Sequence, residues 1–136
     1  MPGPYLIEKL SLLESLDGED AVIADPGYGV QCVGLVKTYS KCGATGDWHQ
    51  GTLVKDATDI RKGTAIATFD ANGKYASKKK GNHACFFIEF VGDLGFRVLE
   101  QHVPPHRDRI QQRVIRYQSG NHISPSDNAN CFSIIV

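Results

Sequence analysis

Apolar residues recur every three to four positions near the start of the chain. Within residues 4–16 the apolar positions with this spacing are Leu6, Ile7, Leu10 and Leu13. Such a period places apolar side chains on one face of a helix, and a proline is acceptable in the first helical turn. We therefore predict an amphipathic helix over residues 4–16 that packs against the rest of the chain.

Two stretches with loop composition flank a second apolar segment. Residues 17–29 and 40–51 are rich in glycine, aspartate and other turn-forming residues. Between them, residues 31–39 (QCVGLVKTY) carry apolar side chains on adjacent helical turns. The two valines lower the helix propensity of this segment because they are β-branched, but a helix is still our prediction.

The second half of the chain has a different pattern. Short runs rich in β-branched and aromatic residues alternate with clusters of glycine, proline and asparagine, as in antiparallel sheets. These runs cover residues 63–69, 83–91, 95–101, 112–118 and 131–136. The sequence VGDLG at residues 91–95 suits a hairpin connection. Because helices come first and strands follow, we predict an α+β fold with N-terminal helices packed on an antiparallel sheet of about five to six strands.

Length and composition indicate one globular domain over residues 1–136. The chain is 41% hydrophobic and 22% charged, and its 15 basic residues balance its 15 acidic residues. A net charge of zero argues against a protein that coats nucleic acid, because such binding rests on phosphate neutralisation. No apolar run approaches the roughly 20 residues of a membrane span. The N-terminus lacks the pattern of a secretory signal, so we expect synthesis in the cytoplasm without a signal peptide.

The cysteines and histidines do not form a metal-binding pattern. The four cysteines allow three complete disulfide pairings, and none of them is part of a CxxC motif. His102 and His106 have a spacing that suits metal ligands on a helix, but Pro104 and Pro105 between them exclude an ordinary helix. We expect neither a metal site nor a cofactor.

Cys32 is the candidate nucleophile. It follows a glycine-rich turn in GYGVQCVGLV and stands where the second predicted helix begins. The positive end of a helix lowers the pKa of a thiol, and the free backbone N–H groups there can stabilise an oxyanion. Tyr28 and Gln31 are candidates for an additional donor. The alternative is that Cys32 is a packed core residue, a common position for a free cysteine.

His83 and Glu100 are the candidates for the base and for the group that orients it. His83 opens one predicted strand, and the hairpin places it roughly opposite residues 99–102 of the next. A carboxylate at that place would hold the imidazole and stabilise its charged form. His122 is the other candidate base, whereas His49 lies in a predicted loop. The alternative interpretation makes His83 a strand end and Glu100 an exposed strand residue.

Four segments in this order resemble the NlpC/P60 and CHAP superfamily of papain-like cysteine peptidases and amidases. They are GVQCVGLVK, IRKGTAIATF, GNHACFFIEF and FRVLEQH. The resemblance implies a papain-like NlpC/P60 fold in a single catalytic domain. It also implies a Cys–His–Glu site, with Cys32 as nucleophile, His83 as base and Glu100 as the third member. His102 is a rival for that third role, because many members of the superfamily use a third histidine.

The same resemblance implies a substrate groove. Trp48 and Gly51, in WHQGTLV, look like the segment that lines the groove in CHAP domains. Gln101, next to Glu100, is a further groove candidate. Each of these motifs is short, and it is their order along the chain that favours a cysteine hydrolase.

Within the superfamily the chain looks most like the amidase effectors of type VI secretion, of family 3 or the related family 2. This implies hydrolysis of the meso-diaminopimelate–D-alanine crosslink in peptidoglycan, which lyses rival bacteria. The implied partners are peptidoglycan stem peptides, a secretion apparatus, and a cognate immunity protein that blocks the active site. The implied destination is the periplasm of a target Gram-negative cell.

Two other functions stay open, and so does the state of the cysteines. The same chemistry on the γ-D-glutamyl–diaminopimelate bond is one alternative, and a non-catalytic α+β binding module is the other. A toxin that acts in the periplasm can hold a disulfide. Cys42 with Cys131 is the pair to test first, because Cys85 is expected in the core near the active site.

Overall fold

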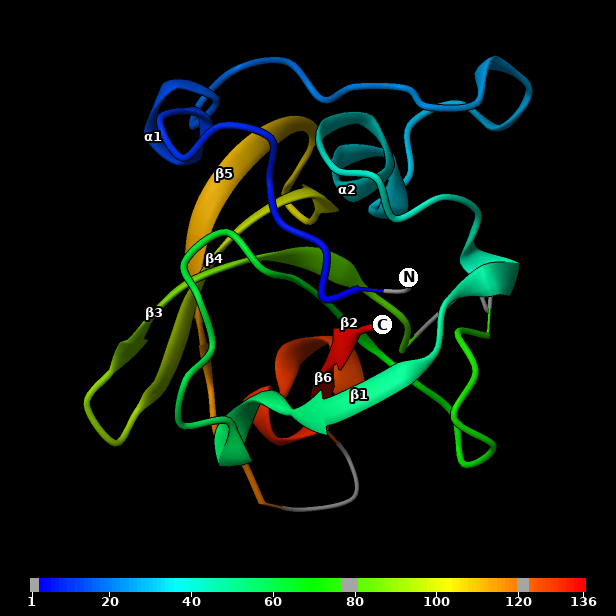
Figure 1. Cartoon of the computed structure of the whole chain (residues 1–136). Helices are drawn as coiled ribbons and strands as arrows, with labels where there is room; N and C mark the ends of the chain where they lie inside the picture. The colour runs from blue at the N-terminus through cyan, green and yellow to red at the C-terminus, as the bar shows by residue number, and fades with distance from the viewer. Residues whose placement is uncertain (1–2, 77–80, 120–122) are drawn as a thin grey trace.

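The computed structural model describes residues 3–76, 81–119 and 123–136. Within these residues the strands form one six-stranded antiparallel sheet in the order β1-β6-β2-β3-β4-β5 (Figure 1). The strands are β1 (Gln50–Leu53), β2 (Ala65–Thr68), β3 (Ala84–Val91), β4 (Gly95–Val103), β5 (His106–Arg116) and β6 (Phe132–Ile135). The predicted α+β class and the antiparallel sheet are confirmed.

The helices are short. They are α1 (Leu12–Ser15) and α2 (Val33–Tyr39), with 3₁₀ turns η1 (Pro26–Tyr28), η2 (Thr45–Asp47), η3 (Val54–Asp56), η4 (Pro125–Asp127) and η5 (Ala129–Cys131). Both α-helices lie on one side of the sheet, and the turns η4 and η5, in orange-red, lie on the other side beside β6 (Figure 1). In the part of the chain that the structure describes, no helix has the length and apolar character to cross a membrane.

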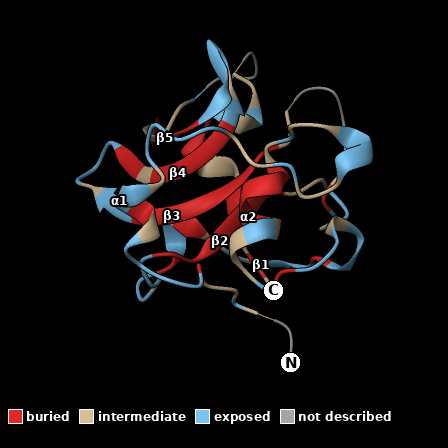
Figure 2. Ribbon diagram, turned by 90° about the horizontal axis from the view of Figure 1, so that it is seen from above, coloured by how far each residue is buried: buried red, intermediate tan, exposed pale blue. Residues whose placement is uncertain are grey.

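Each face of the sheet has its own apolar core. Leu35 and Val36 of α2 pack with Phe86, Leu99 and Ile110 on the face that the helices cover. A second cluster, which includes Ile66, Phe87, Phe96, Val98 and Phe132, fills the opposite face. Figure 2 shows the buried residues concentrated along β2, β3 and β4, whereas α1 and the connecting loops are mostly exposed. Side chains alternate between the two cores along each central strand, as the two-residue period requires.

The strand predictions from sequence correspond to β2, β3, β4, β5 and β6. The predicted hairpin at residues 91–95 is confirmed by the pairing of Val91 with Gly95. β5 begins at His106, earlier than predicted, because His106 pairs with Val103 and the hairpin continues to a tight turn. Pro104 and Pro105 occupy that turn, where neither residue needs to donate a ladder hydrogen bond.

The predicted helix over residues 4–16 is wrong except for its last turns. Leu6 forms a β-bridge with Thr64, and the N–H of Ile7 donates to the carbonyl of Gly63. The backbone of this segment is therefore extended along the chain that leads into β2, and only residues 12–15 are helical. Pairing with a neighbouring segment overrides the local helical period, as tertiary context commonly does.

The predicted loop over residues 40–51 also differs, because it ends in strand β1. Gln50 pairs with Ile135 and Leu53 pairs with Ser133 of β6. Gly51 packs directly on β6, where an added Cβ would lie 2.7 Å from the carbonyl oxygen of Ile134. Four residues with alternating exposure are too short a run to be recognised from their period alone.

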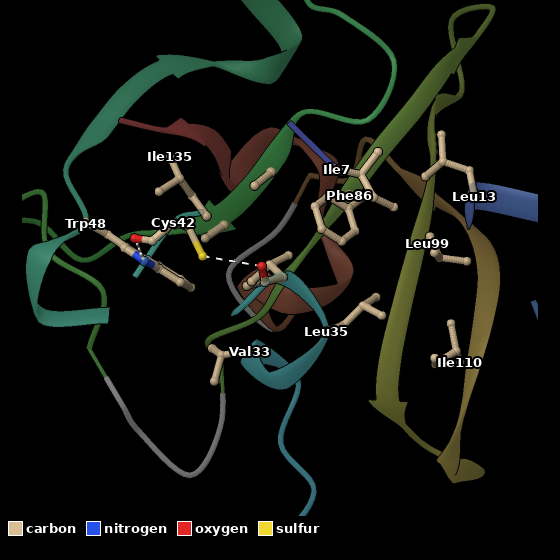
Figure 3. Packing of buried hydrophobic residues seen from close by; sticks show 14 of the residues in the cluster. Ile7, Leu13, Val33, Leu35, Cys42, Trp48, Phe86, Leu99, Ile110 and Ile135 are labelled. Atoms are coloured by element: carbon tan, nitrogen blue, oxygen red, sulfur yellow. Dashed lines mark hydrogen bonds between the residues drawn. The ribbon is translucent and has the colours of Figure 1, made fainter. Parts of the chain in front are cut away.

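The expected Cys42–Cys131 disulfide is wrong, because all four cysteines are free. Cys42 is buried on the helix side of the sheet, where its thiol donates to the carbonyl oxygen of Val36 at 3.5 Å (Figure 3). Cys131 ends η5, whose Ala129 packs in the cluster on the opposite face. The sheet separates the two thiols.

Candidate active site

Cys32 is the N-cap residue of α2, as the sequence predicted for a nucleophile. Gly29, just before it, has φ 68°, a left-handed conformation that glycine adopts without strain and that turns the chain into the helix. Gly34 lets other parts of the chain approach the first turn of α2. An added Cβ at Gly34 would lie 2.8 Å from the carbonyl oxygen of Val22 and 2.9 Å from Nε2 of Gln101.

Gln101 uses this close approach to hold the start of α2. It is buried, and its Nε2 donates to the carbonyl oxygens of Val22 at 2.8 Å and Gln31 at 2.6 Å. Its Oε1 accepts from the backbone N–H of Val22 at 2.9 Å. The Gln101 amide therefore ties residue 31, immediately before Cys32, to the segment that crosses over α2. Gln101 positions the cysteine and does not line the cavity, so its predicted groove role is corrected.

His83 is held at the entrance of β3. Its backbone N–H donates to Oγ1 of Thr68 at 3.0 Å, and its carbonyl accepts from the N–H of Thr68 at 3.0 Å. The imidazole Nε2 lies 2.8 Å from Oε1 of Glu100, and both side chains are buried. The ring also interacts with the thiol of Cys32, closely enough that each group shifts the pKa of the other. The structure therefore brings together the three side chains that the sequence singled out.

Glu100 is a buried carboxylate surrounded by donors. Besides His83, it contacts Gln111, whose Nε2 donates at 3.1 Å, and Arg113, whose Nη2 donates at 3.1 Å and whose Nε lies 2.7 Å away. Arg113 is in turn held by Asp127 at 2.9 Å. Burial opposes ionisation of Glu100, but the hydrogen bond from His83 and the charges of His83 and Arg113 outweigh it. The pKa of Glu100 therefore lies below its ordinary value.

The same environment charges the cysteine–histidine pair. Burial opposes ionisation of Cys32, but the hydrogen bond from His83, the charge of His83, and hydrogen bonds from Tyr75 and the backbone of Ala84 lower the pKa of the thiol. Burial also disfavours the charged imidazole, yet its hydrogen bonds to Cys32 and Glu100 raise the pKa of His83 to about 9. This arrangement favours a thiolate beside an imidazolium, the reactive form of a cysteine nucleophile.

A cavity of about 480 Å³ opens on this pair. Its lining includes Cys32 and His83, and also Tyr75, Asn82 and Arg107. Gln31 and His102 lie on its wall as well. A cavity of this size accommodates a short peptide-like segment with its scissile bond next to the sulfur.

Tyr28, a candidate donor, and Trp48, a candidate groove residue, lie elsewhere. Tyr28 is 74% exposed in η1 and is not part of the cavity wall. Trp48 is only 2% exposed and packs in the core, where its Nε1 donates to the carbonyl oxygen of Cys42 at 3.1 Å (Figure 3). Its ring meets the ring of Tyr75 edge to face, with centroids 5.0 Å apart. Trp48 therefore supports a cavity residue from behind, because a large aromatic ring gains most from burial.

Comparison with known proteins identifies the family. The model of the family described as "Domesticated amidase effector 2" matches residues 14–135. This chain belongs to the domesticated amidase effector 2 family.

Two relatives support this membership in the amidase effector family. The type VI secretion amidase effector 2 protein of Salmonella typhi is 35% identical over 114 residues, which cover 77% of this chain and 84% of that protein. A solved structure of "Type 6 secretion amidase effector 2 (Tae2)" aligns with a TM-score of 0.76 at 30% identity, over 98% of this chain and 94% of that chain.

The sequence left other histidines as rivals for the base and for the third member of the site. His102 lines the cavity with φ 64°, but Glu100 and not His102 meets Nε2 of His83. His49 and His106 are exposed at β1 and at the start of β5. His122 lies outside the described residues. Of the two candidates for the third member, Glu100 is the one that contacts the His83 ring.

Sequence reasoning missed four polar residues of this amidase effector site. They are Tyr75, Asn82, Arg113 and Asp127. Arg113 follows from the strand register, because Glu100 pairs with Gln111 and position 113 lies on the same face two residues on. Finding it required the start of β5, which the sequence placed too late. Tyr75 and Asn82 come from the connection between β2 and β3, where no period constrains the direction of a side chain.

Proposed function

We propose that this chain is a peptidoglycan amidase effector that hydrolyses the meso-diaminopimelate–D-alanine crosslink with Cys32, His83 and Glu100. The observation that carries the proposal is the continuous contact from the Cys32 thiol through the His83 ring to the buried Glu100 carboxylate, next to a cavity. Membership in an amidase effector family agrees with such a hydrolase. A papain-like NlpC/P60 mechanism is part of the proposal.

The mechanism follows from the charges in the site. The Cys32 thiolate attacks the carbonyl carbon of the scissile amide, so an S–C bond forms and the carbonyl π electrons move to oxygen. The imidazolium of His83 gives its proton to the leaving amine as the C–N bond breaks. Neutral His83 then takes a proton from water, whose oxygen attacks the thioester and releases the acid and the thiolate. Glu100 holds the ring and stabilises its charged form throughout.

The cavity wall supports a substrate that carries carboxylates. Arg107 and His102 line it beside the catalytic pair, and Arg113 adds a guanidinium that Glu100 and Asp127 already bind. Stem peptides of peptidoglycan carry free carboxylates near their crosslinks. A cationic group at the mouth of a cavity attracts and orients such substrates.

The remaining parts of the proposal concern delivery and control. The Salmonella typhi relative is described as a type VI secretion amidase effector. By analogy, we propose that a secretion apparatus delivers this chain to the periplasm of a target Gram-negative cell. A cognate immunity protein that fills the 480 Å³ cavity would prevent self-intoxication.

The test is digestion of purified Gram-negative sacculi, with the released muropeptides identified by mass spectrometry. Wild type is expected to convert crosslinked dimers into tetrapeptide monomers by cutting between D-alanine and meso-diaminopimelate. Cys32→Ala is expected to release none, while Cys131→Ser, a thiol on the other side of the sheet, is expected to match wild type. Products cut at the γ-D-glutamyl–diaminopimelate bond would show that this bond, and not the proposed crosslink, is the substrate.

The rival interpretation, a binding module with an inert Cys32, predicts different thiol chemistry. A thiolate beside His83 is expected to react with iodoacetamide much faster than free cysteine near neutral pH. A thiol protected until the protein unfolds, together with intact sacculi, would contradict the hydrolase.

A further inference from the structure

We propose that Tyr75, held by Asn82, is the side-chain donor of the oxyanion hole. The inference rests on the proposed amide hydrolysis and assigns a catalytic residue to it. It differs from the sequence prediction, which considered Tyr28 and Gln31 for this role. Tyr28 lies outside the cavity, and the contact that holds Gln31 in place is made by its backbone carbonyl.

The position of the Tyr75 hydroxyl carries the proposal. It lies 3.5 Å from Sγ of Cys32, and both residues line the cavity. Nδ2 of Asn82 donates to the same hydroxyl oxygen at 3.1 Å. Because one lone pair accepts from Asn82, the hydroxyl proton is available to a negatively charged group beside the sulfur. The Asn82 bond also polarises the O–H group and makes it a stronger donor.

The ring of Tyr75 is held in place before any substrate binds. It is 8% exposed and packs edge to face on Trp48. Trp48 is itself anchored, because its Nε1 donates to the carbonyl oxygens of Cys42 at 3.1 Å and Gly43 at 3.3 Å. A donor fixed in this way needs no reorganisation when charge develops in the reaction, which is the condition for effective transition-state stabilisation.

The electrostatics of Tyr75 suit a donor and not a base. Burial and the nearby Cys32 thiolate both raise the pKa of its hydroxyl, so it stays protonated across the working pH range. As the S–C bond forms, negative charge leaves the sulfur and appears on the carbonyl oxygen attached to the attacked carbon. The Tyr75 O–H, which faces the sulfur in the free enzyme, then donates to that oxygen. No proton is transferred in this step.

The main variant is Tyr75→Phe, which removes only the hydroxyl and keeps the ring packed on Trp48. With a purified crosslinked muropeptide dimer as substrate, we expect kcat to fall by about 10²- to 10³-fold with little change in KM. Tyr117→Phe is the matched control, because Tyr117 packs on the opposite face of the sheet, and it is expected to keep wild-type kcat. Asn82→Leu keeps the phenol and is expected to lower kcat by about tenfold, so it tests the same donor independently.

Two further measurements distinguish an oxyanion donor from a hydroxyl that only lowers the pKa of the Cys32 thiol. The rate of Cys32 alkylation by iodoacetamide against pH reports the pKa of the thiol, and a peptide aldehyde reports binding of a tetrahedral adduct. We expect aldehyde affinity in Tyr75→Phe to fall together with kcat, while the alkylation profile changes little.

Three results would overturn the assignment. The first is full kcat in Tyr75→Phe. The second is a loss that follows a raised thiol pKa and recovers at high pH. The third is a comparable loss of aldehyde affinity in Gln31→Leu and none in Tyr75→Phe. A wild-type protein that leaves the dimer intact would instead refute the proposed function, so the two failures are distinguishable.

Discussion

The two faces of strand β4 hold two buried polar networks of opposite character. On one face Glu100 binds His83, Gln111 and Arg113, and every contact involves a charge or an amide that faces a charge. On the other face the neutral amide of Gln101 joins the backbone of Val22 and residue 31. Glu100 and Gln101 are adjacent in one strand, and from opposite faces of the sheet each contacts a residue that lies beside Cys32.

The difference separates two tasks that any cysteine nucleophile needs. The charged network decides whether the thiol and imidazole ionise, because it shifts the pKa values of His83 and Cys32. The neutral network decides where the cysteine stands, because it fixes the backbone just before α2. A charge on the second face would have no counter-ion, and burying one unpaired would cost several kcal/mol.

Glu100→Gln is expected to have the largest effect, because it removes the charge but keeps the shape. We predict a loss of kcat on the order of 10³- to 10⁴-fold, comparable with neutralising the acid of a catalytic triad. The pKa of His83 should fall, since the carboxylate raises it. Steady-state kinetics on the muropeptide dimer and ring NMR of His83 measure the two effects. A variant with wild-type kcat would show that the charged network has no catalytic role.

Gln101→Leu tests the neutral network. It leaves the carbonyl and N–H of Val22 and the carbonyl of Gln31 without the amide, so we expect a loss of about 1 to 3 kcal/mol in the free energy of unfolding. Urea denaturation measures this loss. The iodoacetamide profile of Cys32 against pH should keep its midpoint, in contrast to Glu100→Gln. A large shift of that midpoint would mean that the two networks are not separate.

The pH dependence of kcat/KM should be set by the residues of the charged network and not by Gln101. We expect an acid limb at the lowered pKa of Cys32 and an alkaline limb near pH 9, where His83 loses the proton that the leaving amine needs. The alkaline limb should move to lower pH in Glu100→Gln and stay in place in Gln101→Leu. An alkaline limb near the ordinary histidine pKa in wild type would contradict the proposed ion pair.

The free energy of unfolding should also depend on pH through His83 and Glu100, in opposite directions. The pKa of His83 is raised in the folded protein, so its contribution is complete below the unfolded histidine pKa and disappears as pH rises through about 9. The pKa of Glu100 is lowered, so its contribution is complete above the unfolded glutamate pKa and is lost as pH falls through the folded value. Urea denaturation at a series of pH values measures the loss of stability at high pH and at low pH. The pH ranges of these two losses should not change in Gln101→Leu.

Cys131→Ser is expected to have the smallest effect. Cys131 contacts neither network, and burial raises the pKa of its thiol, so the variant should keep wild-type kcat and lie within about 0.5 kcal/mol of wild-type stability. Unreduced protein should titrate four thiols after unfolding. Two titratable thiols together with a stability loss in Cys131→Ser would indicate a disulfide with Cys42 after all.

Five of the six strands could be predicted from the sequence, and so could the three residues that form the candidate site. Five strands have enough apolar residues for their period to be recognised, and the hairpin at residues 91–95 gives the approximate register. Cys32 at a helix start, His83 at a strand start and Glu100 on the paired strand followed from these elements. The helix over residues 4–16 failed because Leu6 and Ile7 pair with the segment before β2. β1 was missed because it is short and is defined by its pairing with β6.

What the sequence by itself determined is the position of five strands and the choice of candidate nucleophile, base and carboxylate, because both depend on local spacing and residue type. The tertiary structure alone decided which neighbours complete them. It placed Trp48 in the core and Tyr75 beside the sulfur, and it assigned Arg113 to Glu100 and Gln101 to the start of α2. These contacts join residues 13 to 79 positions apart, and loops and strand register, which local periodicity does not specify, bring them together.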